Sequence, residues 1–145
     1  MPRVYTSSVI PAPAAEVWRV LRDFNGLASW TGLVNDSRIE GLLRPDQVGC
    51  IRSFRLKDGG IIRERLLALS DYDMSCTYSI LESPMAVTDY IATLSLTPIT
   101  DGNVTFAQWQ AEFDCPSDQE AALATQIGAG VFQTAFSALK QRFGR

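Results

Sequence analysis

The C-terminal stretch from Ser117 to Phe143 constrains the fold of this chain more than any other part of the sequence. Its apolar residues recur at steps of three and four, as they do on one face of a helix. At about 1.5 Å per residue, a helix of this length is roughly 40 Å long and needs a broad apolar surface to lie on. The apolar face consists of Ala124, Ile127, Val131, Phe132, Ala135, Phe136 and Leu139.

Both ends of this helix carry sequence signals. Ser117-Asp118-Gln119-Glu120 has the S-x-x-E pattern, which predicts a reciprocal side-chain cap on the first turn. Two cationic residues and Gly144 at the other end are typical of a last turn and a stop. Gly128 and Gly130 lie in the middle, where each costs about 1 kcal/mol relative to alanine. They indicate either close approach to a sheet or room beside a cavity.

Seven other stretches have the residue patterns of β-strands, and two short helices, 14–24 and 27–30, separate the first two. Short breakers such as Asp58-Gly59-Gly60 and Asp101-Gly102-Asn103 favour antiparallel neighbours. The predicted fold is α+β: a seven-stranded antiparallel sheet wraps around the long C-terminal helix, in one domain of residues 1–145. The predicted strands are residues 3–10, 33–40, 50–56, 61–69, 74–81, 88–96 and 104–114.

The absence of histidine restricts the chemistry of this chain. Without histidine there is no Ser-His-Asp or Cys-His triad, and the usual zinc and iron ligand sets are missing. Cys50, Cys76 and Cys115 are widely spaced and odd in number, so we interpret them as reduced, half-buried thiols. We therefore expect no metal site and no cofactor, and any proton transfer would fall to carboxylates, tyrosines, lysines or water.

Charge and hydropathy set further limits on partners. The net charge is −3 and there is no basic run, which argues against nucleic acid as a partner. Arg52, Arg55, Arg63 and Arg65 are interpreted as solvated charge on an outer sheet face. No apolar run could span a bilayer, and the N-terminus lacks the apolar segment of a signal peptide, so we expect a cytoplasmic protein. A homodimer is left open.

The strand 61–69 points a carboxylate toward the core. Two arginines are costlier to bury than one glutamate, so the face with Arg63 and Arg65 should be exposed to solvent. That arrangement directs Glu64 inward among apolar neighbours, and desolvation there should raise its pKa. The predicted inward residues of this strand are Ile62, Glu64, Leu66 and Ala68.

These patterns together resemble the START/Bet v 1-like (SRPBCC) superfamily, and within it the polyketide cyclase/dehydrase and lipid transport families. The resemblance covers nearly the whole chain and implies the helix-grip fold, with a large cavity between sheet and helix. The stretches that carry it are Pro11 to Trp18, Asp23-Phe24, Trp30, Val48 to Phe54, Arg63 to Leu67 with Asp71, Tyr78 to Ile80, Asp89-Tyr90 and Trp109 to Phe113.

The central stretch is also similar to the plant abscisic-acid receptors. That similarity implies that Glu64 and Tyr90 line a ligand pocket, that loop 57–61 stands in place of a gate and that loop 81–87 stands in place of a latch. The receptor lysine that pairs the hormone carboxylate corresponds to Asn35, and a helix asparagine corresponds to Ala135. Both replacements argue against abscisic acid and against an anionic ligand held in the same way.

Alternatives remain open at each candidate residue. Glu64 either lines a pocket or is a buried carboxylate satisfied by a neighbouring group, and Tyr78 and Tyr90 either orient a ligand or bond to the backbone in the core. Trp109 is interpreted as core facing the helix, with a cavity wall as the alternative, and Asn35 is expected to point inward. The predicted ligand-binding residues are Glu64, Tyr78, Tyr90, Asn35, Ile62, Leu66, Trp109, Val131 and Ala135.

The leading hypothesis is the binding of a hydrophobic small molecule, such as a lipid, polyketide or aromatic compound, for transport, storage or sensing. The alternative is a polyketide cyclase or aromatase that uses Glu64 with Tyr78 or Tyr90 for proton transfer. A third hypothesis is an interaction module whose loops dock a partner when the pocket is loaded. No catalytic residue is assigned beyond Glu64 as a candidate.

Overall fold

The computed structural model describes residues 1–144, and within that range seven strands form one antiparallel sheet. Strands β2 to β7 follow each other as a meander, and β1 joins the sheet beside β7, at the edge opposite β2. The seven predicted strands are confirmed, with boundaries shifted by at most a few residues. The strands are β1 (Arg3–Ile10), β2 (Val34–Ile39), β3 (Ile51–Leu56), β4 (Ile61–Ser70), β5 (Ser75–Glu82), β6 (Thr88–Ile99) and β7 (Val104–Asp114).

Two short helices connect β1 to β2, as predicted. The second, α2 (Leu27–Trp30), has the predicted bounds, but α1 (Ala14–Leu21) ends three residues earlier than expected. Its early end has a local cause, because a turn forms around Asp23. The Asp23 carboxylate accepts a hydrogen bond from the Asn25 N–H at 3.0 Å, and its carbonyl accepts one from the Gly26 N–H at 2.9 Å.

The long C-terminal helix is continuous, but its winding changes along its length. It begins as a 3₁₀ turn, η1 (Ser117–Gln119), and continues as α3 (Glu120–Thr125), the π-helical segment η2 (Gln126–Gln133) and α4 (Thr134–Phe143). The predicted capping box is wrong, since no side chain caps the first turn. Instead the Gln119 N–H bonds to the Pro116 carbonyl at 3.0 Å, so a backbone acceptor takes the place of the serine.

The two mid-helix glycines serve different purposes. A Cβ added at Gly128 would lie 3.1 Å from Cγ1 of Val4, so the missing side chain lets the helix approach β1 closely. A Cβ added at Gly130 would meet nothing within 4 Å. Both readings of these glycines therefore hold, one at each position.

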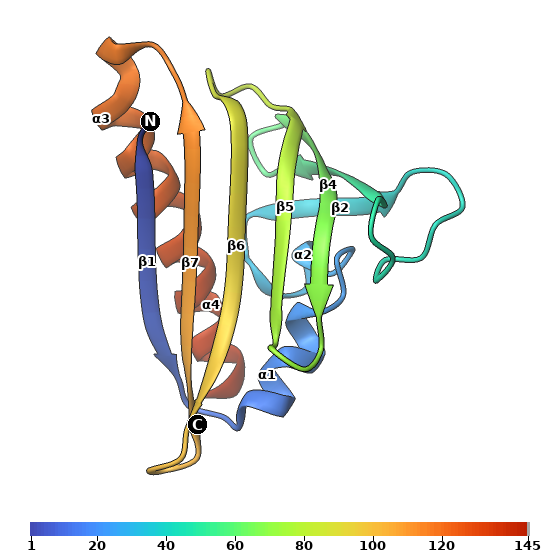
Figure 1. Ribbon diagram of the computed structural model, residues 1–145, viewed down its shortest axis with the longest axis vertical. Helices are drawn as coiled ribbons and strands as arrows, with labels where there is room; N and C mark the ends of the chain where they lie inside the picture. Colours follow the sequence, from blue (N-terminus) through green and yellow to red (C-terminus); the bar gives the residue numbers. More distant parts are fainter. Residues whose placement is uncertain (145) are drawn as a thin grey trace.

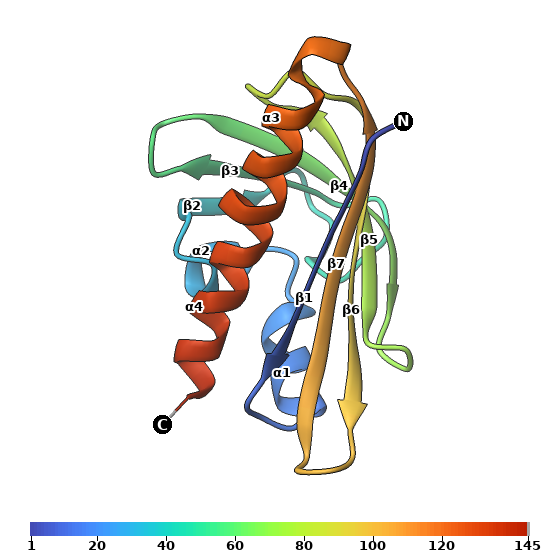
Figure 2. The same ribbon diagram turned by 90° about the vertical axis from the view of Figure 1, so that its left-hand side faces the viewer.

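The sheet wraps around the long helix and buries its apolar face. Figure 2 shows the helix crossing in front of the sheet, with β2 and β3 on one side in the view and β5 to β7 on the other, and Figure 1 shows the same layers from another direction. Phe132, Ala135 and Phe136 are fully buried between helix and sheet. This architecture is the predicted α+β helix-grip fold. Among residues 1–144, no helix combines the length and the apolar character that a membrane crossing requires.

Strand β4 has the predicted division of faces over most of its length. Glu64 is buried, whereas Arg65 is exposed and Arg63 forms ion pairs with two glutamates at the surface. The expectation for Ala68 is wrong, because this residue is exposed. A register shift between Leu66 and Ala68 in the pairing with β5 reverses the alternation there.

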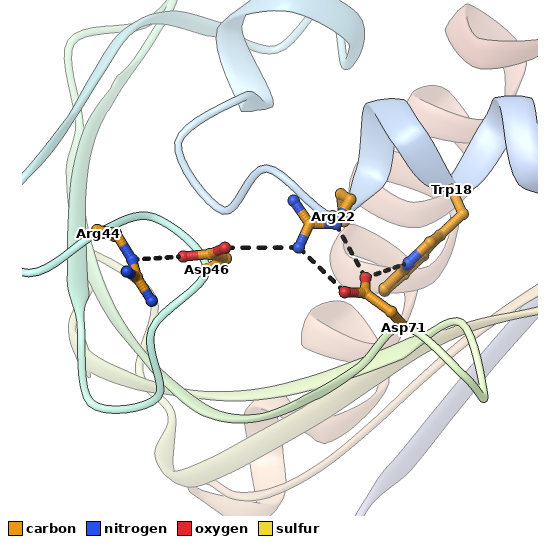
Figure 3. Close-up of polar contacts among 5 residues, drawn as sticks. All are labelled: Trp18, Arg22, Arg44, Asp46 and Asp71. Carbon is orange, nitrogen blue, oxygen red and sulfur yellow. Dashed lines mark hydrogen bonds and ion pairs between the residues drawn. The ribbon is translucent and has the colours of Figure 1, made fainter.

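A polar network fastens α1 to two connections of the sheet (Figure 3). The Asp71 carboxylate, in the turn after β4, accepts hydrogen bonds from Trp18 Nε1 at 2.8 Å and from Arg22 Nε at 2.9 Å. Arg22 also contacts Asp46 at 3.5 Å, and Asp46 accepts a hydrogen bond from Arg44 at 3.3 Å. The β2–β3 connection and the β4–β5 turn are thereby held against the same helix.

Candidate functional site

A cavity of about 640 Å³ lies between the inner face of the sheet and the C-terminal helix. Its volume falls within the range of about 300–1,000 Å³ that is usual for small-molecule sites. The π-helical segment η2 contributes the helix wall at Ile127, Gly130 and Val131. Most of the lining is apolar, and examples from separate elements are Leu27, Val34, Ile62, Ile80, Leu123 and Val131.

Glu64 lines this cavity and forms a buried ion pair with Arg52. Nε of Arg52 lies 2.8 Å from Oε1 of Glu64, and Nη2 of Arg52 lies 2.6 Å from the same oxygen. Both residues are about 5% exposed. The pair results from the sheet register, since Arg52 on β3 and Glu64 on β4 are directly paired across the two strands.

The position of Arg52 corrects the expectation that it belongs to an outer basic strip. Its strand alternates so that Cys50, Arg52 and Phe54 share the buried face, while Arg55 is exposed. That alternation is visible in the sequence and is the signal that could have identified Arg52 as an inward residue. An arginine directly opposite an inward glutamate also fits a favourable cross-strand pair.

Aromatic rings and a carbonyl complete the surroundings of Arg52. Its guanidinium carbon lies 3.8 Å from the ring centroid of Phe24 and 4.8 Å from that of Tyr78. Nη1 of Arg52 donates a hydrogen bond to the Phe24 carbonyl oxygen at 3.1 Å. These contacts hold the cation in place by cation–π attraction and hydrogen bonding, so it presents a fixed geometry to the cavity.

The burial of the pair affects the titration of Glu64. Removal from water raises the pKa of the Glu64 carboxyl above its ordinary value, and the adjacent Arg52 guanidinium opposes that shift. The expected direction of the shift is thus confirmed. The arginine that opposes it was not foreseen.

Tyr78 and Tyr90 both line the cavity from neighbouring strands. Their ring centroids are 6.4 Å apart, and the Tyr78 hydroxyl accepts a hydrogen bond from Trp109 Nε1 at 3.0 Å. Burial raises the pKa of both hydroxyls, so both remain protonated at neutral pH. The two tyrosines therefore offer polar handles in an otherwise apolar wall.

Trp109 is both a core residue and part of the cavity lining. It is 3% exposed and stacks on Phe132 of the C-terminal helix, with ring centroids 4.3 Å apart and an interplanar angle of 11°. Trp30 packs against Trp109, with ring centroids 6.2 Å apart, but Trp30 is not among the lining residues. The two alternatives weighed for Trp109 are therefore not exclusive.

The structure brings seven of the nine predicted site residues to the cavity. Leu66 is fully buried but belongs to the core behind the lining. The inward placement of Asn35 is wrong, because its side chain is exposed and lies outside the lining. A register shift between Val34 and Asp36 explains this, since it displaces Asn35 from the alternation of β2. The seven are Glu64, Tyr78, Tyr90, Ile62, Trp109, Val131 and Ala135.

The two loops that were compared with a gate and a latch carry exposed residues of the cavity lining, and we refer to this end of the cavity as its mouth. Lys57 and Asp58 line it from the β3–β4 turn, and Pro84 to Ala86 line it from the β5–β6 connection. The two loops are close together, because a Cβ added at Gly60 would lie 3.3 Å from Cγ of Pro84. Gln119 and Gln126 of the C-terminal helix face the same space.

Other groups that could carry chemistry are few. Within residues 1–144, no cluster of three or more histidine, cysteine, aspartate or glutamate side chains is arranged to hold a metal ion. The three cysteines are free thiols. Cys50 and Cys76 are buried rather than half-buried, and Cys115 is partly exposed.

The comparisons with known proteins agree with this geometry. A family model described as polyketide cyclase / dehydrase and lipid transport matches residues 1–144. The solved structure of the protein XoxI from Bacillus cereus is 26% identical, with a TM-score of 0.87, and covers 99% of this chain and 96% of its own. A solution structure from Thermobifida fusca is 30% identical, with a TM-score of 0.90, and covers 100% of this chain and 95% of its own. No curated protein matches the sequence.

Proposed function

The chain belongs to the polyketide cyclase/dehydrase and lipid transport family, and from this premise we propose that it binds a hydrophobic small molecule in its cavity. Transport, storage or sensing of that molecule are the roles consistent with binding alone. The observation that carries the proposal is the cavity of about 640 Å³ with its mostly apolar wall. The likeness to abscisic-acid receptors stays a prediction.

Apolar burial supplies the affinity in this proposal. Each Å² of apolar ligand surface removed from water contributes roughly 25 cal/mol, before the costs of association are subtracted. Wall residues from the sheet and from the C-terminal helix, such as Ile62 and Val131, close around the ligand from opposite sides. Glu64, Tyr78 and Tyr90 orient it, and the loops 57–61 and 81–87 gate its entry.

The proposal is tested with an uncharged fluorescent probe, N-phenyl-1-naphthylamine, and with native mass spectrometry of the purified protein. We expect saturable probe binding and a co-purified small molecule of low polarity. Gly130 lines the cavity, and an added Cβ there would meet no atom within 4 Å, so the phenyl ring of Gly130→Phe should occupy part of the cavity. This variant should weaken probe binding by about tenfold or more, equivalent to about 1.4 kcal/mol.

Ser137→Phe is the matched control, since Ser137 lies on the same helix, is exposed and does not line the cavity. It should leave probe affinity unchanged. Equal probe binding by the wild type and by Gly130→Phe, with both folded, means that the cavity is not the binding site and overturns the proposal.

A cyclase-like enzyme is the second candidate, and one observation favours it. Glu64 is a buried carboxyl with a raised pKa that shares the cavity with two tyrosine hydroxyls. Glu64→Gln distinguishes the two functions. With a poly-β-keto substrate, an enzyme loses turnover far more than affinity, whereas a binding protein changes only in affinity.

A further inference from the structure

The two carboxylate oxygens of Glu64 have different surroundings. Both contacts from Arg52 fall on Oε1, at 2.8 and 2.6 Å. Among residues 1–144, no hydrogen bond is donated to Oε2, and every buried side-chain oxygen or nitrogen without such a bond keeps some accessible surface. Oε2 therefore opens onto the cavity that Glu64 lines.

Oε2 of Glu64 is a buried acceptor that lacks a hydrogen-bond donor. Glu64 is about 5% exposed, so its free oxygen lies in the interior rather than in bulk solvent. A buried acceptor left without a donor costs about 1–3 kcal/mol, and more when it is charged. A ligand group that donates to Oε2 removes that cost, and a ligand group that can only accept does not.

The charge balance of the cavity restricts the ligand further. Arg52 and Glu64 neutralise each other at the inner end, and the mouth carries one lysine, Lys57, and one aspartate, Asp58. A charged ligand head beside the buried pair would leave one uncompensated charge in a low-dielectric interior, which is strongly unfavourable. An uncharged head leaves the balance intact.

We propose that the ligand is an uncharged amphiphile whose hydroxyl or N–H donates a hydrogen bond to Oε2 of Glu64 while its apolar body contacts the cavity wall. This inference rests on the proposed binding function and adds the chemical class of the ligand. It places the polar head of the ligand at the Arg52–Glu64 pair. The apolar body extends toward the mouth, past side chains such as Ile62 and Leu123.

Three compounds with the same chain length test this class: 1-decanol, decyl methyl ether and decanoate. Each is titrated against N-phenyl-1-naphthylamine bound to the wild-type protein at pH 8, where decanoate is ionised. We expect 1-decanol to displace the probe at a concentration about tenfold or more below that of the ether, because the ether cannot donate to Oε2. Decanoate should be the weakest of the three.

Glu64→Gln provides the second arm, because it removes the negative charge and leaves Arg52 uncompensated. In this variant decanoate should bind more tightly than in the wild type, by about tenfold or more, since its carboxylate restores the charge balance. Arg52→Gln/Glu64→Gln is the control, because without the arginine no gain for decanoate is expected. The wild-type comparison needs no substitution, so it decides the question even if these variants do not fold.

The outcomes separate the two proposals. Equal displacement by 1-decanol and the ether, or preference for decanoate, overturns the ligand class while probe binding still supports the cavity as a binding site. No binding of the probe or of any decyl compound by the folded wild-type protein overturns both proposals.

Discussion

Arg52 on β3 and Glu64 on β4 lie directly opposite each other, and the guanidinium Nε of Arg52 is 2.8 Å from Oε1 of Glu64. Both side chains point to the concave side of the sheet, because each occupies a buried position in the alternation of its strand. The pair places two full charges in a site from which bulk water is excluded. Each charge is therefore tolerated only while the other is present.

The first prediction concerns the stability of this pair. Arg52→Leu should lower the free energy of unfolding by about 3–5 kcal/mol, because it leaves the Glu64 charge buried without a partner. Arg52→Leu/Glu64→Leu should recover most of that loss, since apolar residues of similar size suit the surroundings. Urea unfolding of the wild type, both single variants and the double variant measures the coupling. Strictly additive losses would contradict a direct pairing.

The second prediction concerns Asp71, whose pKa is lowered by hydrogen bonds from Arg22 and then from Trp18. A lowered pKa in the folded state stabilises the protein above the unfolded pKa of about 4, and this contribution disappears as the pH falls through the folded pKa. Asp71→Asn should therefore be less stable than the wild type at pH 7, and the difference should shrink as the pH falls below about 4.

Thermal unfolding across this pH range measures the Asp71 effect. Asp36→Asn serves as the control, because Asp36 is an exposed carboxylate on β2 outside the network of Figure 3. A stability difference for Asp71→Asn that does not shrink at all as the pH falls below about 4 would show that the charge of Asp71 is not the cause.

The third prediction compares the two glycines of the π-helical segment. Gly130→Ala should stabilise the protein by about 0.5–1 kcal/mol, because alanine reduces the entropy of the unfolded chain and its Cβ meets no atom within 4 Å. Gly128→Ala should give no gain or a loss, because its Cβ would lie 3.1 Å from Val4. Urea midpoints at equal m-values test this, and equal gains for both variants would contradict the close approach to β1.

The fourth prediction concerns thiol reactivity. Burial raises the pKa of Cys76 to about 11, and Cys50 is also buried with a raised pKa. Cys115 is partly exposed, so iodoacetamide at pH 8 should label it first, though slowly, because its pKa is also raised. Peptide mass spectrometry identifies the sites. Early labelling of Cys50 or Cys76 in folded protein would mean that the core opens readily.

The alternation of apolar and polar residues predicts the buried face of a strand wherever that strand stays in register with its neighbour. On β6, Tyr90, Ala92, Leu94 and Leu96 alternate with more exposed residues, and all four are buried. The same alternation failed at Asn35 and at Ala68, and both lie at register shifts with the neighbouring strand. A bulge depends on how two strands pair, so it cannot be predicted from the sequence of one strand alone.

The inward glutamate could be inferred, but its partner was missed. Glu64 stood out because its neighbours on the same face are apolar, whereas Arg52 was grouped with other arginines by composition rather than by the face it occupies. Pairing two distant strands is what brings the two charges together. Oε2 of Glu64 as the free acceptor follows only from the side-chain geometry of that pair.

The sequence by itself determined the order of strands and helices and the apolar face of the C-terminal helix. These features depend on periodicity and turn residues, which are local properties of the chain. Only the tertiary structure decided that η2 winds as a π-helix, that Gly128 touches β1 while Gly130 faces open space, and that the Arg52–Glu64 pair lies in the cavity. The physical reason is that side chains distant along the sequence share one enclosed volume, and the packing of helix against sheet sets which atoms fill it and which remain free.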